Sequence, residues 1–155
     1  RTSAPAKKMK QKVIQHYSNF IQTKIDSLRQ MIDDLTEDAK NDANGSAGDK
    51  HETALSMMHL EQEKLNQKLK EFLETKAIFD AIDFDKSHSK VMVGSLVLAK
   101  NIYFLISVSL PKVEIEGKTF FAISPQAPLA EMLLGRVIND EILVNNVSYN
   151  IQSIL

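Results

Sequence analysis

Two carboxylates stand three residues apart in the segment Gly48-Asp-Lys-His-Glu52. In a helix this spacing puts Asp49 and Glu52 on one face. Carboxylate oxygens suit Mg²⁺, which typically takes one or two from a protein and completes its shell with water and phosphate oxygens. A purely structural role explains the pair equally well. Asp at an N-cap with Glu three residues later resembles a capping box, which stabilises a helix by on the order of 1 kcal/mol. The pair therefore indicates either half of a shared metal site or a helix start.

Two long stretches without Pro or Gly flank these acids. Between Lys7 and Lys40 the apolar residues alternate steps of four and three, at Ile21, Ile25, Leu28, Ile32, Leu35 and Ala39. A second stretch, from about Lys50 to Phe79, has seam residues at Leu55, Met58, Leu65, Leu69, Phe72 and Phe79. The segment between them is rich in Asn, Asp and Gly, which favour turns. We therefore predict an antiparallel coiled-coil hairpin over residues 1–80, with its loop within Asn41–Asp49 and acids at its tip.

After residue 80 the helical pattern of the sequence ends and a pattern typical of β-strands follows. Residues 81–90 lose the helical period and carry mixed charge, which is typical of a linker. Beyond it, β-branched and aromatic runs predict strands, and a helix is expected where Pro128 precedes an apolar stretch that ends at Gly135. The expected strands are Val91–Ala99, Ile102–Leu110 closed by Pro111, Thr119–Ile123, and a hairpin of Ile142–Val144 and Val147–Ile154; the expected helix is Leu129–Leu134. The sequence thus predicts an α+β fold, with a β-rich domain over residues 91–155.

Composition excludes several classes of site. The chain of 155 residues has 43% hydrophobic and 25% charged residues, values typical of a folded protein. It contains no Cys, which excludes disulfides, thiolate metal sites and cysteine nucleophiles. The longest apolar run, Ile102 to Leu110, is far below the ~20 residues that cross a bilayer. The basic start, with Lys7, Lys8, Lys10 and Lys12, is not followed by the apolar core of a signal peptide, so a cytoplasmic protein is expected.

A helical hairpin with Gly-Asp-x-x-Glu at its tip, joined to a small β domain, resembles the Gre-type transcript cleavage factors of bacterial RNA polymerase. In the C-terminal half, Gly94-Ser-Leu-Val97, Ile123–Gly135 and Val137-Ile-Asn-Asp-Glu141 are similar to the family's strand, its proline-containing loop and helix, and the turn after it. The resemblance covers most of the chain. It implies an FKBP-like domain over residues 91–155 that docks at the rim of the polymerase's secondary channel, while the coiled coil passes down that channel.

The resemblance also implies roles for particular residues. Asp49 and Glu52 fall on the family's tip acids, which help hold a second Mg²⁺ and orient the water that cleaves backtracked RNA. Gln126, Ala127 and Pro128 fall on the docking loop. The protein would then be a cofactor of the polymerase rather than an enzyme, and would share Mg²⁺ only within the polymerase complex. It would meet the nascent RNA 3′ end through the polymerase and act as a monomer.

Two alternatives stay open. Thr53-Ala-Leu-Ser56 differs from the Asn-Ala-Glu-Tyr type of sequence that usually follows the tip acids, which leaves a channel binder that inhibits the polymerase without stimulating cleavage. The second alternative is a stand-alone FKBP-like prolyl isomerase. The short C-terminal half, with no Trp and few aromatic residues to line a proline pocket, disfavours it. The basic start is either a solvated helix end or a contact for RNA phosphates.

Overall fold

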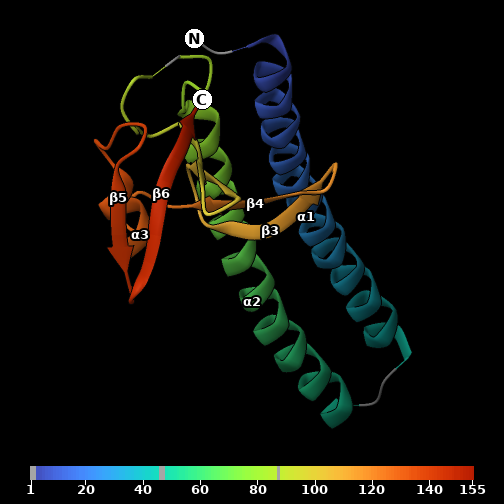
Figure 1. Ribbon diagram of the computed structural model, residues 1–155. Coiled ribbons are helices and arrows are strands. Elements are labelled where there is room, and N and C mark those ends of the chain that lie inside the picture. Colours follow the sequence, from blue (N-terminus) through green and yellow to red (C-terminus); the bar gives the residue numbers. More distant parts are fainter. Residues whose placement is uncertain (1–2, 46–47, 87) are drawn as a thin grey trace. The chain divides into compact units, whose positions relative to one another are not determined.

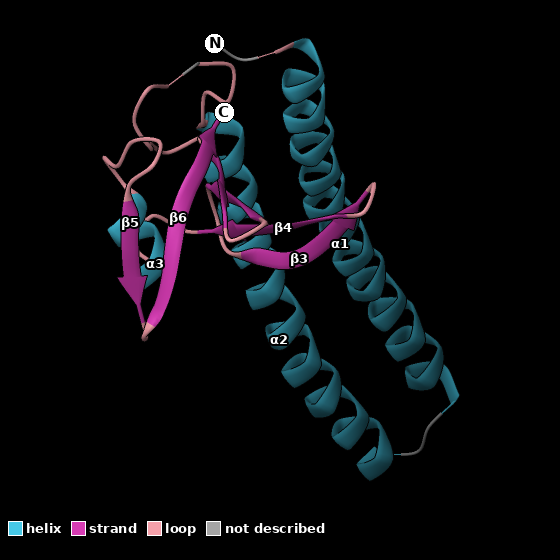
Figure 2. Ribbon diagram, in the orientation of Figure 1, coloured by secondary structure: helices cyan, strands magenta, loops and turns pink. Residues whose placement is uncertain are grey.

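The computed structural model describes residues 3–45, 48–86 and 88–155; residues 42–45 and 48–51 are described by their helical backbone alone. The helices are α1 Ala4–Gly45, α2 Gly48–Ala81 and α3 Pro128–Leu133. The strands are β1 Leu96–Ala99, β2 Ile102–Ile106, β3 Leu110–Ile115, β4 Lys118–Ile123, β5 Glu141–Val144 and β6 Val147–Ile154 (Figures 1 and 2). The expected α+β fold, a long helical hairpin followed by a sheet with one short helix, is confirmed. Within the described ranges, no helix has the length and apolar character needed to cross a membrane.

The chain divides into two compact units. One unit joins the chain up to Ser18 with Ile78–Leu155, and the other is Asn19–Ala77. The first turns of α1 therefore belong with the sheet rather than with the rest of the hairpin. The domains expected from the sequence, 1–80, 81–90 and 91–155, are parts that would fold separately, and they stay a prediction.

In the unit Asn19–Ala77, α1 and α2 run antiparallel as the two arms of a hairpin (Figure 1). The four-and-three spacing puts Ile21, Ile25 and Leu28 on one face of α1, and all three are buried. A polar contact joins the two helices farther along, where Gln62 Nε2 donates a hydrogen bond to Thr36 Oγ1 at 3.0 Å. Of the predicted loop region Asn41–Asp49, the residues up to Gly45 are helical in α1 and those from Gly48 are helical in α2, and residues 46 and 47 lie outside the described residues.

The strands of the described chain form one six-stranded mixed sheet in the order β3-β4-β2-β1-β6-β5. Neighbouring strands are antiparallel except β2 and β4, which pair in parallel with Tyr103 opposite Phe120. Three tight turns connect β1 to β2, β3 to β4 and β5 to β6. Both central residues of each turn have positive φ, as two-residue hairpins require; the pairs are Lys100-Asn101, Glu116-Gly117 and Asn145-Asn146. The hairpin expected at Asn145-Asn146 is confirmed.

Both faces of this sheet are covered. Alternation along the strands sends Val97, Phe104 and Ile106 to one face, where they form a core with Ala130 and Leu133 of α3. Leu105 and Phe120 alternate to the opposite face and are fully buried there. Tyr17 of α1 reaches that side, because its hydroxyl donates hydrogen bonds to the carbonyl oxygens of Pro111 at 3.0 Å and Phe120 at 3.3 Å. The start of α1 is thus tied to β3 and β4.

Two expected strands were wrong in their bounds. The run Val91–Ala99 becomes a strand only from Leu96, because residues 92–95 turn, with Ser95 N–H bonded to the Met92 carbonyl oxygen at 3.0 Å and Gly94 at φ +97°. The run Ile102–Leu110 ends as β2 at Ile106, and Pro111 lies inside the next strand, β3. Proline is tolerated there because β3 is an edge strand whose pairing with β4 shifts register between Leu110 and Val113.

Candidate functional site

The predicted tip acids lie at the start of α2. This helix begins at Gly48, so that Asp49 and Glu52 both fall in its first turns. Glu52 is exposed, whereas the side chain of Asp49 lies outside the described residues, as does the predicted capping contact. Carboxylates at this end of a helix are favoured by the helix dipole. Within the described chain, no three His, Asp or Glu side chains gather into a possible metal site.

The hairpin seam is open toward this end. Leu35 and Ala39 of α1, and Leu55 and Met58 of α2, continue the seam that buries Ile25, but all four are only half-buried. A groove lined by residues of both helices lies here, with a volume of about 370 Å³. The sequence pattern predicted a closed seam, since it counts apolar residues without their sizes. The alanines on both helices were the available signal, because small side chains leave space between facing helices.

The predicted docking loop follows β4. A turn closes from Ser124 to Ala127, where Ala127 N–H donates to the Ser124 carbonyl oxygen at 3.0 Å. Ala127 has extended φ and ψ of −63° and 143°, and Pro128 then begins α3 at a position where its missing N–H costs no helical hydrogen bond. Gln126 and Pro128 are exposed, whereas Ala127 packs against the hydrophobic core. The loop therefore exposes two of the three predicted contact residues to solvent, and the third anchors it to the core.

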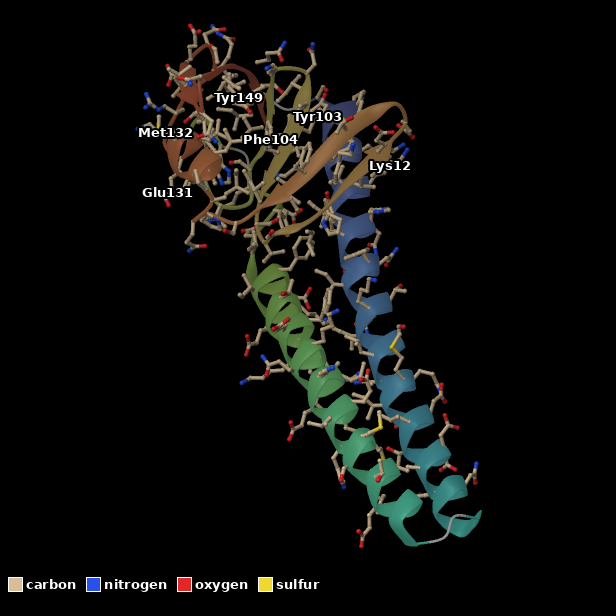
Figure 3. The ribbon with its side chains drawn as sticks, turned by 90° about the horizontal axis from the view of Figure 1, so that it is seen from below. Lys12, Tyr103, Phe104, Glu131, Met132 and Tyr149 are labelled. Carbon is tan, nitrogen blue, oxygen red and sulfur yellow. The ribbon has the colours of Figure 1, made fainter. Side chains whose placement is uncertain are left out.

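Two further residues extend this surface. Glu131 and Met132 follow in α3, and both are exposed, Met132 at 38% (Figure 3). Their neighbours Ala130 and Leu133 face inward and are fully buried. No sequence motif singled out Glu131 or Met132. The helical period was the signal, because a six-residue helix that buries positions 130 and 133 must turn positions 131 and 132 outward.

The basic start of the chain is held against the sheet unit. Lys10 is 6% exposed, and its Nζ donates to the carbonyl oxygen of Leu155 at 3.0 Å. Burial lowers the pKa of Lys10, whereas the negative charges of Asp85 and then Asp83 raise it by less. Lys12 pairs with Glu116 at 2.6 Å, and this contact lowers the pKa of the Glu116 carboxyl. Of the lysines in this run, Lys7 and Lys8 are both exposed, so the RNA contact considered for the basic start would fall to them.

A second polar cluster lies in the segment that leads to β1. His88 Nδ1 is 3.0 Å from the hydroxyl oxygen of Ser95, which also accepts the N–H of Met92 at 2.9 Å. Ser95 is fully buried. Desolvation lowers the pKa of His88, and the ammonium groups of Lys10 and Lys86 lower it further. The neutral form of His88 is therefore favoured in the folded protein, as suits a residue that ties this segment to the start of the sheet.

The structure thus places the two predicted sites in different units. Glu52 belongs to the hairpin unit, and Gln126, Ala127 and Pro128 belong to the sheet unit. Glu52 is exposed on α2, and Gln126 and Pro128 are exposed at or just before the start of α3. A comparison with models of known protein families finds no match, and a search of curated proteins finds no significant relative.

Proposed function

We propose that this protein is a transcription elongation factor of the Gre type, which binds the secondary channel of a bacterial RNA polymerase and stimulates cleavage of backtracked RNA. The observation that carries the proposal is the acidic end of a two-helix hairpin, where Glu52 is exposed in the first turns of α2. No core packing requires an acid at that position. The resemblance of the segment Gly48–Glu52 to the family's tip supports it.

In this mechanism the chain supplies two carboxylates to a site that the polymerase half provides. Asp49 and Glu52 would hold Mg²⁺ together with polymerase carboxylates. When bound, the ion stabilises charge on the scissile phosphate and lowers the pKa of a bound water. The task of this chain is to bring both acids to one helical face and to hold them at the end of a stiff hairpin. The hairpin's buried residues, such as Ile21 and Ile25, supply that stiffness.

The sheet unit would supply the attachment. Exposed Gln126 and Pro128, continued by Glu131 and Met132, form a mixed polar and apolar surface on a rigid helix start. Such a surface suits a contact that must hold while remaining reversible, since its polar groups stay solvated in the free protein. On this proposal the protein is not itself an enzyme, because the cleavage activity belongs to the polymerase.

The test is cleavage of a backtracked elongation complex by purified bacterial RNA polymerase, with and without the protein. Wild type should accelerate cleavage, and Glu52→Gln should abolish most of that acceleration while still binding the polymerase. Gln preserves the hydrogen-bonding role in a capping box but not the charge. Glu63→Gln, an exposed acid on the same helix, is the matched control and should act as wild type. Full stimulation by both Glu52→Gln and Asp49→Asn would refute the catalytic role of the acids.

One observation favours a second candidate, a channel binder that inhibits the polymerase. Thr53-Ala-Leu-Ser56, directly after the acids, departs from the family's usual sequence, and Ala54 and Leu55 line the groove described above. An altered surface beside the acids would change how they meet the polymerase's own metal ligands. The same assay separates the two candidates. A cleavage factor accelerates RNA cleavage, whereas an inhibitor slows RNA extension or cleavage as its concentration rises.

A further inference from the structure

The groove between the two helices of the hairpin has an apolar floor and an acidic edge. Its volume is about 370 Å³, and the apolar residues that line it are Leu35, Ala39, Ala54, Leu55, Met57 and Met58. Asp38 of α1 and Glu61 of α2 also line it. Among the described lining residues none is basic. The groove lies entirely within the unit Asn19–Ala77.

The floor of this groove is incompletely covered in the free protein. Met57 is 66% exposed, and Leu35, Leu55 and Met58 are only half-buried. Apolar surface left in contact with water is unfavourable, and contiguous patches of it mark places where another molecule binds. Methionine is suited to such a place, because its flexible, polarizable side chain adapts to different partners.

The negative charge at the edge of the groove determines which kind of molecule can bind there. Asp38 and Glu61 stand on opposite helices, so both sides of the groove present a carboxylate. Nucleic acid and anionic lipid surfaces would be repelled by these charges. A polypeptide segment that carries Lys or Arg beside apolar side chains would satisfy both the floor and the edge. Amphipathic helices bind apolar grooves in this way, with the apolar face inward and the charged residues at the edges.

We propose that this groove binds a basic amphipathic segment of a protein partner, whose apolar side chains enter between α1 and α2 while its cations pair with Asp38 and Glu61. The proposal concerns the groove and not the tip acids, and it does not depend on which protein supplies the segment. It predicts a recognition surface along the sides of the hairpin, separate from any chemistry at the start of α2.

The probe is a synthetic amphipathic helical peptide of Leu and Lys, added to the full protein with ¹³C-labelled methionine methyl groups. Peptide binding should shift the signals of Met57 and Met58, which line the groove, and leave Met92 and Met132 of the sheet unit unchanged. A peptide in which every Lys is replaced by Glu should not bind, because it meets like charges. Added salt should weaken binding of the Lys peptide, since exposed ion pairs are screened.

Two matched pairs of variants locate the binding. Glu61→Lys should weaken peptide binding on the order of fivefold, because it reverses one charge at the edge, whereas Glu63→Lys reverses an exposed charge outside the groove and should change binding less than about twofold. Met57→Ser should also weaken binding, and Leu60→Ser should not. Met57 and Leu60 are similarly exposed, at 66% and 61%, so neither change removes a core contact.

Three outcomes would overturn the proposal. The first is no detectable binding of the Leu/Lys peptide at about 1 mM. The free energy of binding would then be less favourable than about −4 kcal/mol. The second is an equal loss of peptide affinity in both variants of a matched pair, which would show that the peptide is attracted non-specifically. The third is a shift of the Met57 and Met58 signals with protein concentration alone, which would show that a second copy of the chain covers the groove. Circular dichroism of each variant checks that the helices are retained.

Discussion

The side chain of Lys10, near the start of α1, donates a hydrogen bond from Nζ to the carbonyl oxygen of Leu155, 3.0 Å away and 145 residues later in the chain. Lys10 is 6% exposed. The same carbonyl oxygen accepts the N–H of Leu96 at the start of β1. One atom, in the residue that follows β6, therefore joins the first helix to the start of β1, and a residue from a basic, polar run serves as part of the interior.

Replacing Lys10 by Met should change how stability depends on pH. Burial lowers the pKa of Lys10 from 10.5, so the folded protein binds this proton less tightly than the unfolded chain does. The free energy of unfolding should therefore rise with pH between the lowered pKa and 10.5, and Lys10→Met should lack this rise. Urea unfolding at about pH 8 and about pH 10 measures the difference. Lys12→Met, which removes an exposed lysine, is the control, and an identical pH response of the two variants would contradict the prediction.

Tyr17→Phe should destabilise the sheet unit by about 1 kcal/mol, because it removes a hydroxyl that donates to the carbonyl oxygens of Pro111 and Phe120. Thermal unfolding measures the loss, and Tyr103→Phe is the matched control, since Tyr103 contacts Phe120 by ring stacking instead. Similar losses in the two variants would show that the hydroxyl of Tyr17 contributes nothing particular.

The same residue should be visible in an alkaline titration. Burial raises the pKa of Tyr17 to about 12. In an ultraviolet absorbance titration Tyr17 should therefore ionise late, and this late step should be missing in Tyr17→Phe. A raised pKa means that the folded state resists ionisation. The stability linked to Tyr17 is thus complete below its usual pKa of about 10 and is lost as the pH rises through about 12.

Gly94→Ala should destabilise the protein more than Gly117→Ala. Both glycines have positive φ, +97° and +77°, so both substitutions strain the backbone by about 1 kcal/mol or more. At Gly94 an added Cβ would also lie 2.9 Å from the carbonyl oxygen of Asp83, a backbone atom that cannot move aside alone. At Gly117 it would meet nothing within 4 Å. Chemical denaturation of the two variants measures the difference, and equal losses would mean that the segment around Asp83 yields easily.

Pro128→Glu should weaken binding to bacterial RNA polymerase by at least about tenfold if the loop docks as proposed, because a charge would be buried without a partner. The variant should still fold, since Pro128 is exposed and acidic residues are favoured in the first turn of a helix. Binding of labelled protein to the polymerase, followed by fluorescence anisotropy, measures the affinity. Asn150→Glu adds the same charge at an exposed position of β6 and should bind as wild type. Equal binding by both variants would remove the loop from the interface.

Local patterns accounted for the regular elements. The four-and-three spacing of Ile21, Ile25 and Leu28 predicted a helix with one buried face, and the structure buries all three. Asn145-Asn146 predicted a hairpin, because Asn tolerates the positive φ that both turn positions adopt. Of the candidate site, Glu52 is exposed in the first turns of α2 and Pro128 is exposed at the start of α3, and their roles stay a prediction. These features depend on neighbours within a few residues, which is the range that a sequence pattern reports.

Contacts between distant parts of the chain required the tertiary structure. The sequence marked Pro111 as the end of a strand, whereas the edge position of β3 lets the strand continue through it. It marked Lys10 as solvated, whereas the sheet unit buries it against Leu155. It also counted Ala39 as a member of the buried seam, whereas Ala39 and Ala54 line an open groove. By itself the sequence determined the helices, most strands and the acidic end of the hairpin, because hydrophobic period and turn chemistry act locally. Strand order, the burial of Lys10 and the open seam were decided by tertiary structure, because they depend on which side chains meet across long stretches of chain and on how well their volumes fill the space between them.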